Sequence, residues 1–346
     1  MGILGIAMTT KSKITLPGAL NQTISLQWLS SSGLAINDDE QSLLLNLKDQ
    51  DGLFLAAANE SDLPEVIPDH LIAAALDCLF SNNNQQSEIH LAPSLTERLS
   101  GSGLIHQRLE NTGHGISYRS GFYQNRTLWH WQKDAQLIPE IWTENEKGVV
   151  HPLREVQPSG VVYKRYDYHN DVTVSFRTID LEQDLDLFHS WMNQPRVAEF
   201  WEMAQSREEL KEYLLSLLKD RRTWPLIGSF NGEPFGYFEA YWALEDRIAP
   251  YYDCQPWDRG FHLLVGNMDF LGKRYSNSWT KAFTHFLFLD DPRTTRLVGE
   301  PRADNKRLMK LIAPAGWSFV KEFDFPHKRA ALLNCYRENF FQEVQL

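Results

Sequence analysis

The change in hydrophobic period after residue 222 constrains the fold of this chain more than any other feature. Two stretches with alternating apolar residues, "WPLIGSF" and "FGYFEAYWAL", flank "NGEP", and the dipeptide Asn231-Gly232 is typical of a tight turn between antiparallel strands. A third apolar stretch, "GFHLLVG", begins at Gly260. The sequence therefore predicts a β-hairpin followed by a third strand.

Helical patterns surround these strands. Residues 180–193 carry apolar side chains at helical spacing, and Pro195 is expected to end that helix. Ser206 with Glu209 three residues later predicts a capping box at the start of a second helix. Further on, "SWTKAFTHFLFLD", "TTRLVGEP" and "ADNKRLMKLIAPAG" indicate helix, strand and helix, and "WSFVKEFDF" with "RAALLNCYREN" indicate a closing pair of strands. This order predicts an α/β fold with a mixed sheet and helices on both faces.

The length of 346 residues predicts two domains. Residues 137–160 mix Pro, Gly and charged residues without periodicity, which indicates a connector, and "VVYKRYDYHNDVTVSFRTI" reads as two strands around a turn. We expect a first domain at 1–136, a connector with leading strands at 137–171 and a second domain at 172–346.

The helix–strand–helix layout of the second half has a faint echo in the first half. Pro93 parallels Pro301, but Ala92 stands where the second copy has Glu300. Either the chain contains a duplication with a degenerate first copy, or the similarity arises by chance. On both interpretations the chemistry belongs to the second half.

Composition excludes several function classes. A formal net charge of -11 argues against nucleic-acid binding, and no apolar run approaches the ~18–20 residues that span a membrane. The opening "MGILGIAM" lacks the basic region of a signal peptide. Cys78, Cys254 and Cys335 are odd in number and far apart, which fits reduced thiols in a cytoplasmic protein better than disulfides or a zinc site.

A loop and two side chains are candidates for chemistry. The third strand leads into "LGKRYS", where Gly272, Lys273 and Arg274 precede a helix; such a turn offers backbone N–H groups to an anion, although a solvated turn has the same composition. His262 lies on that strand, and Glu300 ends the next one. A strand–helix–strand unit brings such residues together as a general-base pair. From the residues alone, a packing role for His262 stays open.

Aromatic and hydrogen-bonding residues follow the first of these helices in "HSWMNQPRVAEFW". The stretch is either a lid over a substrate or a Pro-terminated helix whose aromatic residues plug the sheet. Carboxylates on the hairpin and the loop after it are either substrate ligands or ordinary surface charges. The residues that we expect to contact substrate are Asn193, Arg196, Trp201, Glu239, Trp242 and Asp258.

Four blocks occur in order between residues 189 and 333: "HSWMNQPRVAEFW", "GYFEAYWALEDRIAPYYDCQPWDRGFHLLVG", "DDPRTTRLVGEPRADN" and "DFPHKRAALL". As a set they resemble the siderophore hydroxylamine acyltransferases of the aerobactin, alcaligin and mycobactin types, which belong to the GCN5-related N-acetyltransferases (GNAT). The resemblance implies a GNAT acyltransferase fold in residues 172–346, with a degenerate GNAT-like half in front of it.

The same resemblance implies direct transfer from acetyl-CoA or succinyl-CoA to the nitrogen of an N-hydroxylated amine, without a metal. It implies His262 as the general base and Glu300 as its carboxylate partner. The residues that it assigns to acyl-CoA are Leu264, Val265, Gly266, Gly272, Lys273, Arg274, Tyr275, Ser276 and Asn305. A backbone N–H near Val265 would stabilise the oxyanion. The expected substrate is a small hydroxylamine, and other enzymes of siderophore biosynthesis are candidate partners.

Two positions depart from the family pattern. Arg274 and Ser276 replace the two glycines of the general GNAT phosphate loop, and Ile312 stands where many GNAT enzymes have a tyrosine that protonates the thiolate. We therefore expect no side-chain general acid. Two rival functions stay open: a GNAT enzyme for an ordinary amine, and a non-catalytic acyl-CoA-binding partner. The residues do not separate acetyl from succinyl donors, or hydroxylysine from hydroxylated diamines.

Overall fold

The computed structural model describes residues 11–15, 23–49, 52–83, 85–130 and 139–346. Contacts divide the chain into two compact units. The first comprises Met1–His130, Lys164–Thr173 and Phe341–Leu346, and the second comprises Trp131–Tyr163 and Val174–Phe340. The predicted boundary at 136/137 lies outside the described residues. The predicted connector is divided differently, because residues 164–173 pack with the first unit.

An eight-stranded sheet forms the first unit, in the order β1-β2-β3-β4-β5-β6-β8-β7. Its strands are β1 Lys11–Thr15, β2 Thr23–Trp28, β3 Gly33–Asn37, β4 Ser42–Asp49, β5 Leu53–Ala57, β6 Glu88–Leu91, β7 Gln107–Arg108 and β8 Gly115–Tyr118. Its helices are α1 Asp69–Asn82, α2 Pro93–Arg98, α3 Arg119–Tyr123 and α4 Arg126–Trp129.

The second sheet has the order β11-β12-β13-β14-β15-β16-β18-β17, and β9 with β10 forms a separate hairpin. The strands are β9 Trp142–Glu144, β10 Val150–Pro152, β11 Val161–Asp167, β12 Val172–Thr178, β13 Thr223–Phe230, β14 Glu233–Trp242, β15 Arg259–Val265, β16 Arg296–Gly299, β17 Ser318–Asp324 and β18 Arg329–Tyr336. The helices are α5 Leu181–Met192, α6 Pro195–Trp201, α7 Arg207–Lys219, α8 Lys273–Asp290, α9 Lys306–Ile312 and α10 Arg337–Glu343.

The two sheets share one topology. In each, the sixth strand pairs parallel with the fifth across a long helix, and the last two strands are exchanged in order. This agreement supports the duplication over a chance similarity. The first copy ends its sixth strand at Leu91, before Ala92 and Pro93, so no carboxylate stands where Glu300 does.

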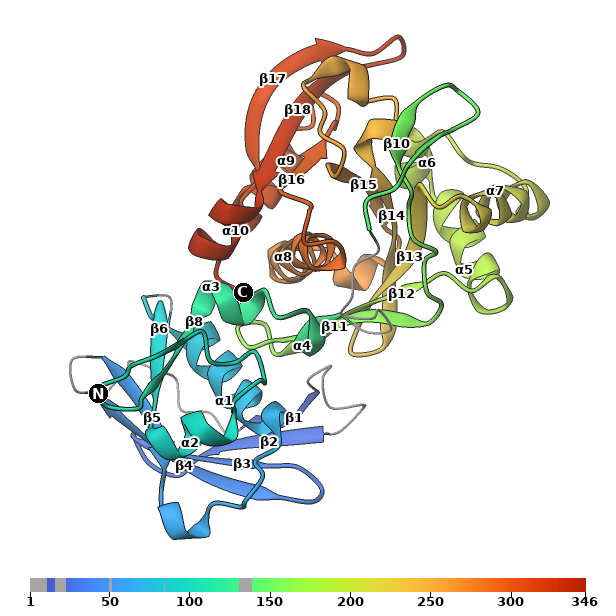
Figure 1. Cartoon of the computed structure of the whole chain (residues 1–346). Helices are drawn as coiled ribbons and strands as arrows, with labels where there is room; N and C mark the ends of the chain where they lie inside the picture. The colour runs from blue at the N-terminus through green and yellow to red at the C-terminus, as the bar shows by residue number, and fades with distance from the viewer. Residues whose placement is uncertain (1–10, 16–22, 50–51, 84, 131–138) are drawn as a thin grey trace. The chain divides into compact units, whose positions relative to one another are not determined.

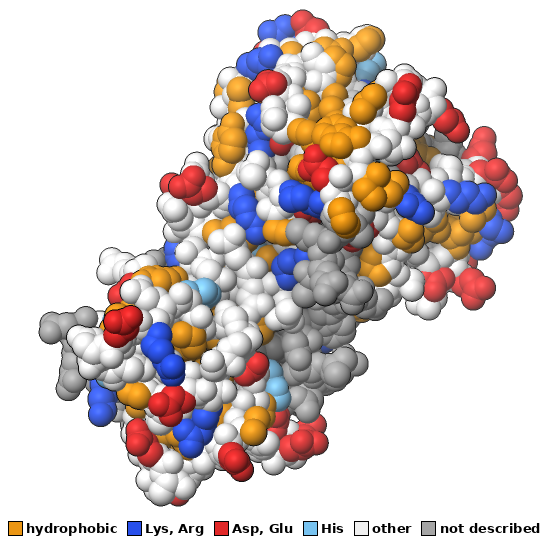
Figure 2. Space-filling model, viewed as in Figure 1, with side chains coloured by type: hydrophobic (Ala, Val, Ile, Leu, Met, Phe, Trp, Pro, Cys, Tyr) orange, Lys and Arg blue, Asp and Glu red, His pale blue; other side chains and the backbone are white. Residues whose placement is uncertain are grey.

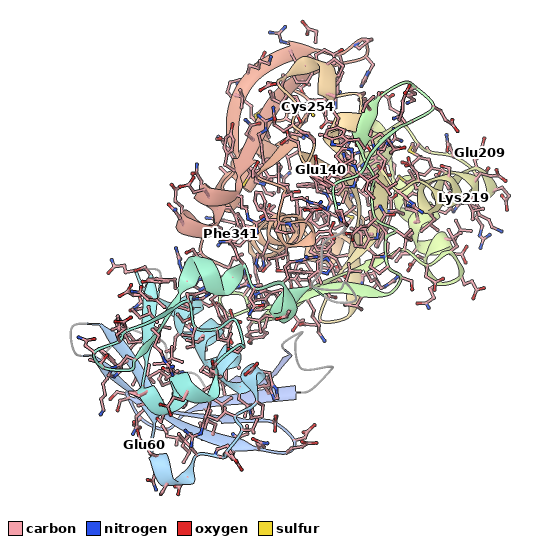
Figure 3. All side chains as sticks on the ribbon, in the orientation of Figure 1. Glu60, Glu140, Glu209, Lys219, Cys254 and Phe341 are labelled. Carbon is pink, nitrogen blue, oxygen red and sulfur yellow. The ribbon has the colours of Figure 1, made fainter. Side chains whose placement is uncertain are left out.

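Several local predictions are confirmed. The turn between β13 and β14 has positive φ at both Asn231 and Gly232, which this tight turn requires. Helix α7 begins with the predicted capping box: Ser206 caps the N–H of Glu209, and the Glu209 carboxylate accepts from the N–H of Ser206. Figure 3 labels Glu209 and Lys219 along this helix.

Three helix boundaries differ from the predictions. Pro195 does follow the end of α5 but also begins α6, because proline is well tolerated at the first helical position. Helix α8 begins at Lys273, five residues before the predicted start at Ser278, so Lys273 and Arg274 lie in its first turn and not before it. The closing strand β18 ends at Tyr336, and α10 follows it.

Helices cover both faces of the second sheet (Figure 1): α8 lies on one face, and α5 and α7 lie on the other. On the α8 face, Phe283 packs against Phe176 and Phe238 of the sheet. No helix in the described ranges is long and apolar enough to cross a membrane. Figure 2 shows Lys, Arg, Asp and Glu side chains interspersed over the surface in view.

The parallel strands β15 and β16 separate soon after they meet. They pair at Arg259 with Leu297 and at Gly260 with Val298, whereas β15 continues to Val265. On its other side β15 stays paired with β14 along its whole length. A free edge of β15 from Phe261 onward therefore faces an opening in the middle of the sheet, and this opening positions the site.

Candidate active site

His262 lies at the point where the two strands separate, between two carboxylates. Its Nδ1 is 3.1 Å from Oε2 of Glu239, the residue opposite it on β14, and its Nε2 is 3.1 Å from Oε1 of Glu300, which follows β16. The two glutamate side chains are buried, and the ring is 29% exposed. We call these three residues the carboxylate–histidine triad.

Tyrosine hydroxyls fix both carboxylates of the triad. Tyr237 donates to Glu239 Oε1 at 2.9 Å, Tyr213 of α7 donates to the same oxygen, and Tyr241 donates to Glu300 Oε2 at 2.7 Å. Gly260 makes room for the last contact, because a Cβ there would lie 2.3 Å from the Tyr241 ring. Tyrosine donors favour the charged form of each carboxylate.

This geometry favours a protonated His262. Carboxylate oxygens only accept hydrogen bonds, so both ring nitrogens are satisfied at once only when both carry protons. Burial alone lowers the pKa of His262, but the bonds to Glu239 and Glu300 outweigh it and raise the pKa to about 10. Burial raises the pKa of Glu300, yet the bond to His262 and its charge, with Lys328 and Tyr241, together outweigh burial and lower the pKa to about 2. The pKa of Glu239 is likewise lowered, because its bonds to His262 and to two tyrosine hydroxyls outweigh burial.

A pocket of about 500 Å³ exposes the triad. Aromatic and aliphatic side chains form most of its wall. Charged residues outside the triad also line it, namely Arg222, Asp246, Arg247 and Lys328. Lys328 donates to the backbone oxygen of Glu300 at 2.7 Å, which ties β18 to the end of β16. The pocket therefore combines apolar walls with charges of both signs.

A second groove, of about 560 Å³, runs beside the free edge of β15. It is lined by Leu263, Leu264 and Val265 and shares several residues with the first pocket. The side chains of α6 reach its backbone: Trp201 Nε1 donates to Leu263 O at 3.3 Å, and Arg196 Nη2 donates to Val265 O at 2.6 Å. Backbone groups of residues 263 and 265 thus point into the groove.

Helix α8 is the next helix after β15 along the chain, and its N-terminus is the candidate phosphate site. Gly272 precedes the helix with a φ of 115°, and the first helical bond runs from the N–H of Ser276 to the carbonyl of Gly272. The N–H groups of residues 273–275 therefore have no acceptor within the helix. Lys273 and Arg274 are exposed, and Tyr275 packs against Phe230. Such a helix start accommodates a phosphate group.

The structure brings together only part of the predicted substrate set. Glu239 and Trp201 line the pocket of the triad, and Arg196 lines the second groove. Glu239 is a partner of His262, which the sequence did not indicate. Trp201 and Arg196 lie on α6 and contact backbone oxygens of β15. The end of the stretch that the sequence marks as a possible lid is therefore a helix beside the groove.

Three predicted substrate residues have other roles and do not line the described pocket. Asp258 is buried and pairs with Arg296 at an oxygen that also accepts from Tyr252. Trp242 lies under the guanidinium groups of two buried arginines. Asn193 ends α5 and bonds the backbone of that helix. Each of these side chains has a partner within the fold, and its role in substrate binding stays a prediction.

Of the residues assigned to acyl-CoA, Leu264, Val265 and Asn305 line the second groove. Asn305 also caps α9 by accepting from the N–H of Leu308. The Ser276 hydroxyl donates to the carbonyl of Lys273, which is a bond within the first turn of α8. A Cβ on Gly266 would lie 2.1 Å from the Trp191 ring, which explains the glycine by packing.

Sequence reasoning missed Tyr213, Tyr241, Asp246 and Lys328. All four line the pocket of the triad. Tyr213 lies on α7, Tyr241 on β14, Asp246 in the turn after β14 and Lys328 just before β18. No local sequence pattern predicts that these four segments meet around His262. The one available signal was the two-residue spacing of Tyr237, Glu239 and Tyr241, which places them on one face of a strand.

Comparisons with known proteins show the family of this chain. Residues 180–325 match the model of the acetyltransferase (GNAT) domain. The chain is 44% identical to the N(6)-hydroxylysine O-acetyltransferase of Escherichia coli over 67% of this chain and 73% of that protein. It is 40% identical to a hydroxyornithine transacylase of Ajellomyces capsulatus, over 56% of this chain and 45% of that protein.

Two further proteins extend the likeness. A Schizosaccharomyces pombe protein, assigned by name to the lysine N-acyltransferases, is 34% identical over 92% of this chain and 95% of its own length. The crystal structure of an uncharacterized Bacillus halodurans protein superposes with a TM-score of 0.50 and 30% identity, covering 54% of this chain and 95% of that one. The chain therefore belongs to the GNAT acyltransferases of siderophore biosynthesis.

Proposed function

We propose that this protein transfers an acyl group from acyl-CoA to the nitrogen of an N-hydroxylated amine and so forms a hydroxamate. The carboxylate–histidine triad, exposed at the separation of β15 and β16, is the observation that carries the proposal. The names of the relatives, which act on hydroxylysine and hydroxyornithine, support the class of acceptor.

Acyl-CoA fits the second groove and the start of α8. Pantetheine amides form hydrogen bonds like those of a strand, and the free edge of β15 at residues 263–266 offers that pairing. The pyrophosphate would lie at the N–H groups of residues 273–275, with Lys273 and Arg274 as exposed cations. Arg196 and Trp201 already hold two carbonyls of this edge, so they shape the groove and leave phosphate binding to the helix start.

The reaction requires one bond to form and one to break. The hydroxylamine nitrogen attacks the thioester carbonyl carbon, the carbonyl π electrons move to oxygen, and the tetrahedral intermediate expels the CoA thiolate. The nitrogen loses one proton on the way. We assign stabilisation of the oxyanion to a backbone N–H of the β15 free edge, at Leu263 or Val265, because the carbonyls of these residues accept from side chains on that side.

His262 is the proposed acceptor of that proton. Because the triad holds a proton on the ring at rest, His262 acts as a base only after losing it, and activity should rise with pH toward the pKa of about 10. An alkyl hydroxylamine is less basic than an amine, so its nitrogen is available over this range. Ile312 lines the pocket at the position where many GNAT enzymes have a tyrosine that protonates the thiolate. The CoA thiolate therefore leaves without a side-chain acid.

The donor is acetyl-CoA or succinyl-CoA, and the location is the cytoplasm. Cys78, Cys254 and Cys335 all lie in the described part of the chain, and none of them forms a disulfide. That fits the reducing conditions of the cytoplasm. Other enzymes of siderophore biosynthesis are the proposed partners, because the hydroxylamine must be made before it is acylated.

Ferric-hydroxamate colour tests the proposal. Purified protein is incubated with acetyl-CoA or succinyl-CoA and with N6-hydroxylysine or lysine, and CoA thiol release is followed in parallel. Thiol release with colour from N6-hydroxylysine alone is expected. Thiol release from lysine without colour would establish the ordinary-amine alternative, and no turnover with bound acyl-CoA would establish the non-catalytic one.

A further inference from the structure

The pocket of the triad holds charges that the acyl transfer does not use. They lie in the turn that follows β14, where Asp246 and Arg247 are adjacent residues and both line the pocket. Glu239 and Glu300 on the same wall are already bonded to His262 and to tyrosine hydroxyls. The turn therefore adds one carboxylate and one guanidinium next to a site whose own charges are paired.

Arg247 forms only a long ion pair with Glu300. Its Nη2 lies 3.8 Å from Glu300 Oε1, the oxygen that is only 3.1 Å from His262 Nε2. The Arg247 side chain is 51% exposed, and its guanidinium lies over the ring of Phe325 at 5.6 Å. It is thus held at the pocket by its stem and ring contact while its donors remain available to an anion.

Asp246 is a carboxylate that is available to a cation. One oxygen, Oδ1, accepts from the N–H of Ile248, and no ion pair involves this carboxylate among the described residues. Burial raises the pKa of Asp246, and the nearby charge of Glu300 raises it further. A cation bound beside Asp246 would stabilise its ionised carboxylate and offset both effects on its pKa.

A third side chain holds this turn in place. Arg222 donates through Nη1 to the backbone oxygen of Glu245, the residue before Asp246, and pairs through Nη2 with Asp220. Its Nε is buried, so a ligand in the pocket does not reach that atom. Arg222 therefore helps to position Asp246 and Arg247 at the pocket.

An α-amino acid carries these two complementary charges on one carbon. Its carboxylate matches Arg247, and its ammonium matches Asp246. A hydroxylated diamine offers the ammonium but leaves the guanidinium without an anion. We propose that Arg247 and Asp246 recognise the carboxylate and the ammonium of an amino-acid acceptor and so select it over a hydroxylated diamine. This inference rests on the proposed function and names the residues that determine its specificity.

N-hydroxycadaverine is the matched probe, because it is N6-hydroxylysine without the carboxylate. Arg247→Gln should lower kcat/KM for N6-hydroxylysine about 30- to 100-fold and change kcat/KM for N-hydroxycadaverine less than threefold, as expected for the loss of a charge-assisted contact. Asp246→Asn should lower both, since both acceptors carry the ammonium. Arg207→Gln, at an exposed arginine paired with Asp186, is the matched control and should change neither.

The outcomes separate the two proposals. Hydroxamate from both acceptors with equal kcat/KM in the wild type, or an equal loss for both acceptors in Arg247→Gln, would overturn the inference and leave the proposed function intact. A loss confined to succinyl-CoA in Arg247→Gln would assign the guanidinium to the acyl group and overturn it as well. Absence of hydroxamate with every acceptor would overturn the proposed function itself.

Discussion

The substitution Glu239→Gln isolates the carboxylate that the sequence did not connect to His262. It removes one of the two charges that hold the ring proton and keeps the size of the side chain. The amide oxygen should stay with the hydroxyls of Tyr213 and Tyr237, which turns the NH2 group toward His262 Nδ1. A donor in that position disfavours a proton on Nδ1, so the pKa of His262 must fall.

The size of the change follows from the symmetry of the triad. The pKa of His262 is raised from 6.5 to about 10, which corresponds to about 4.8 kcal/mol at ~1.36 kcal/mol per pH unit. The two carboxylates lie at the same distance of 3.1 Å from the ring. Because burial opposes them, the two carboxylates together contribute more than this net rise, and removing one should lower the pKa by at least ~2 pH units.

A pH profile of kcat/KM measures this shift. The base must be neutral, so kcat/KM of the wild type should rise about tenfold per pH unit below a pKa near 10 and level off above it. In Glu239→Gln the rising limb should level off at or below about pH 8. Glu233→Gln, on the same strand but exposed, is the control. A limb that stays in place in Glu239→Gln, or activity that falls from pH 7 to 9 in the wild type, would refute His262 as the base.

Three further variants test separate parts of the site. His262→Ala should reduce turnover by ~10²–10⁴-fold while the Kd for CoA stays nearly unchanged; wild-type turnover would remove the ring from the mechanism. Gly260→Ala forces the Tyr241 ring away from Glu300 and should cost ~1–3 kcal/mol of unfolding free energy together with activity, whereas an unchanged melting temperature would contradict the packing argument. Lys273→Gln should raise KM for acyl-CoA severalfold at low salt and less at high salt; a salt-independent effect would exclude a phosphate contact.

Patterns of period and turn chemistry predicted most of the second unit. The Asn231-Gly232 turn and the Ser206 capping box depend on neighbours in sequence, and the structure confirms both. The pairing of His262 with Glu300 was also within reach, because a strand–helix–strand unit has one common geometry. Local rules succeed where the contact partners are set by the backbone of one motif.

Other parts of the site depend on contacts that no local pattern contains. Glu239 became a partner of His262 through the register of β14 against β15, which the lengths of the strands and the loop between them do not determine. The sequence leaves Asp258 available for substrate, but in the structure Arg296 Nη2 lies 2.5 Å from its Oδ2. Pro195 predicts the end of α5, although the same ring geometry also suits the first position of a helix.

The position of the new acyl bond tests the central claim most directly. Acyl-CoA labelled with ¹³C at the carbonyl is incubated with the protein and N6-hydroxylysine labelled with ¹⁵N at the hydroxylamine nitrogen, and the product is examined by NMR. We predict a one-bond coupling between the two labels, because attack by nitrogen at the triad gives a hydroxamate. A product that carries the acyl group without that coupling would place it on the hydroxylamine oxygen or on the α-amino group, and either result would contradict the account.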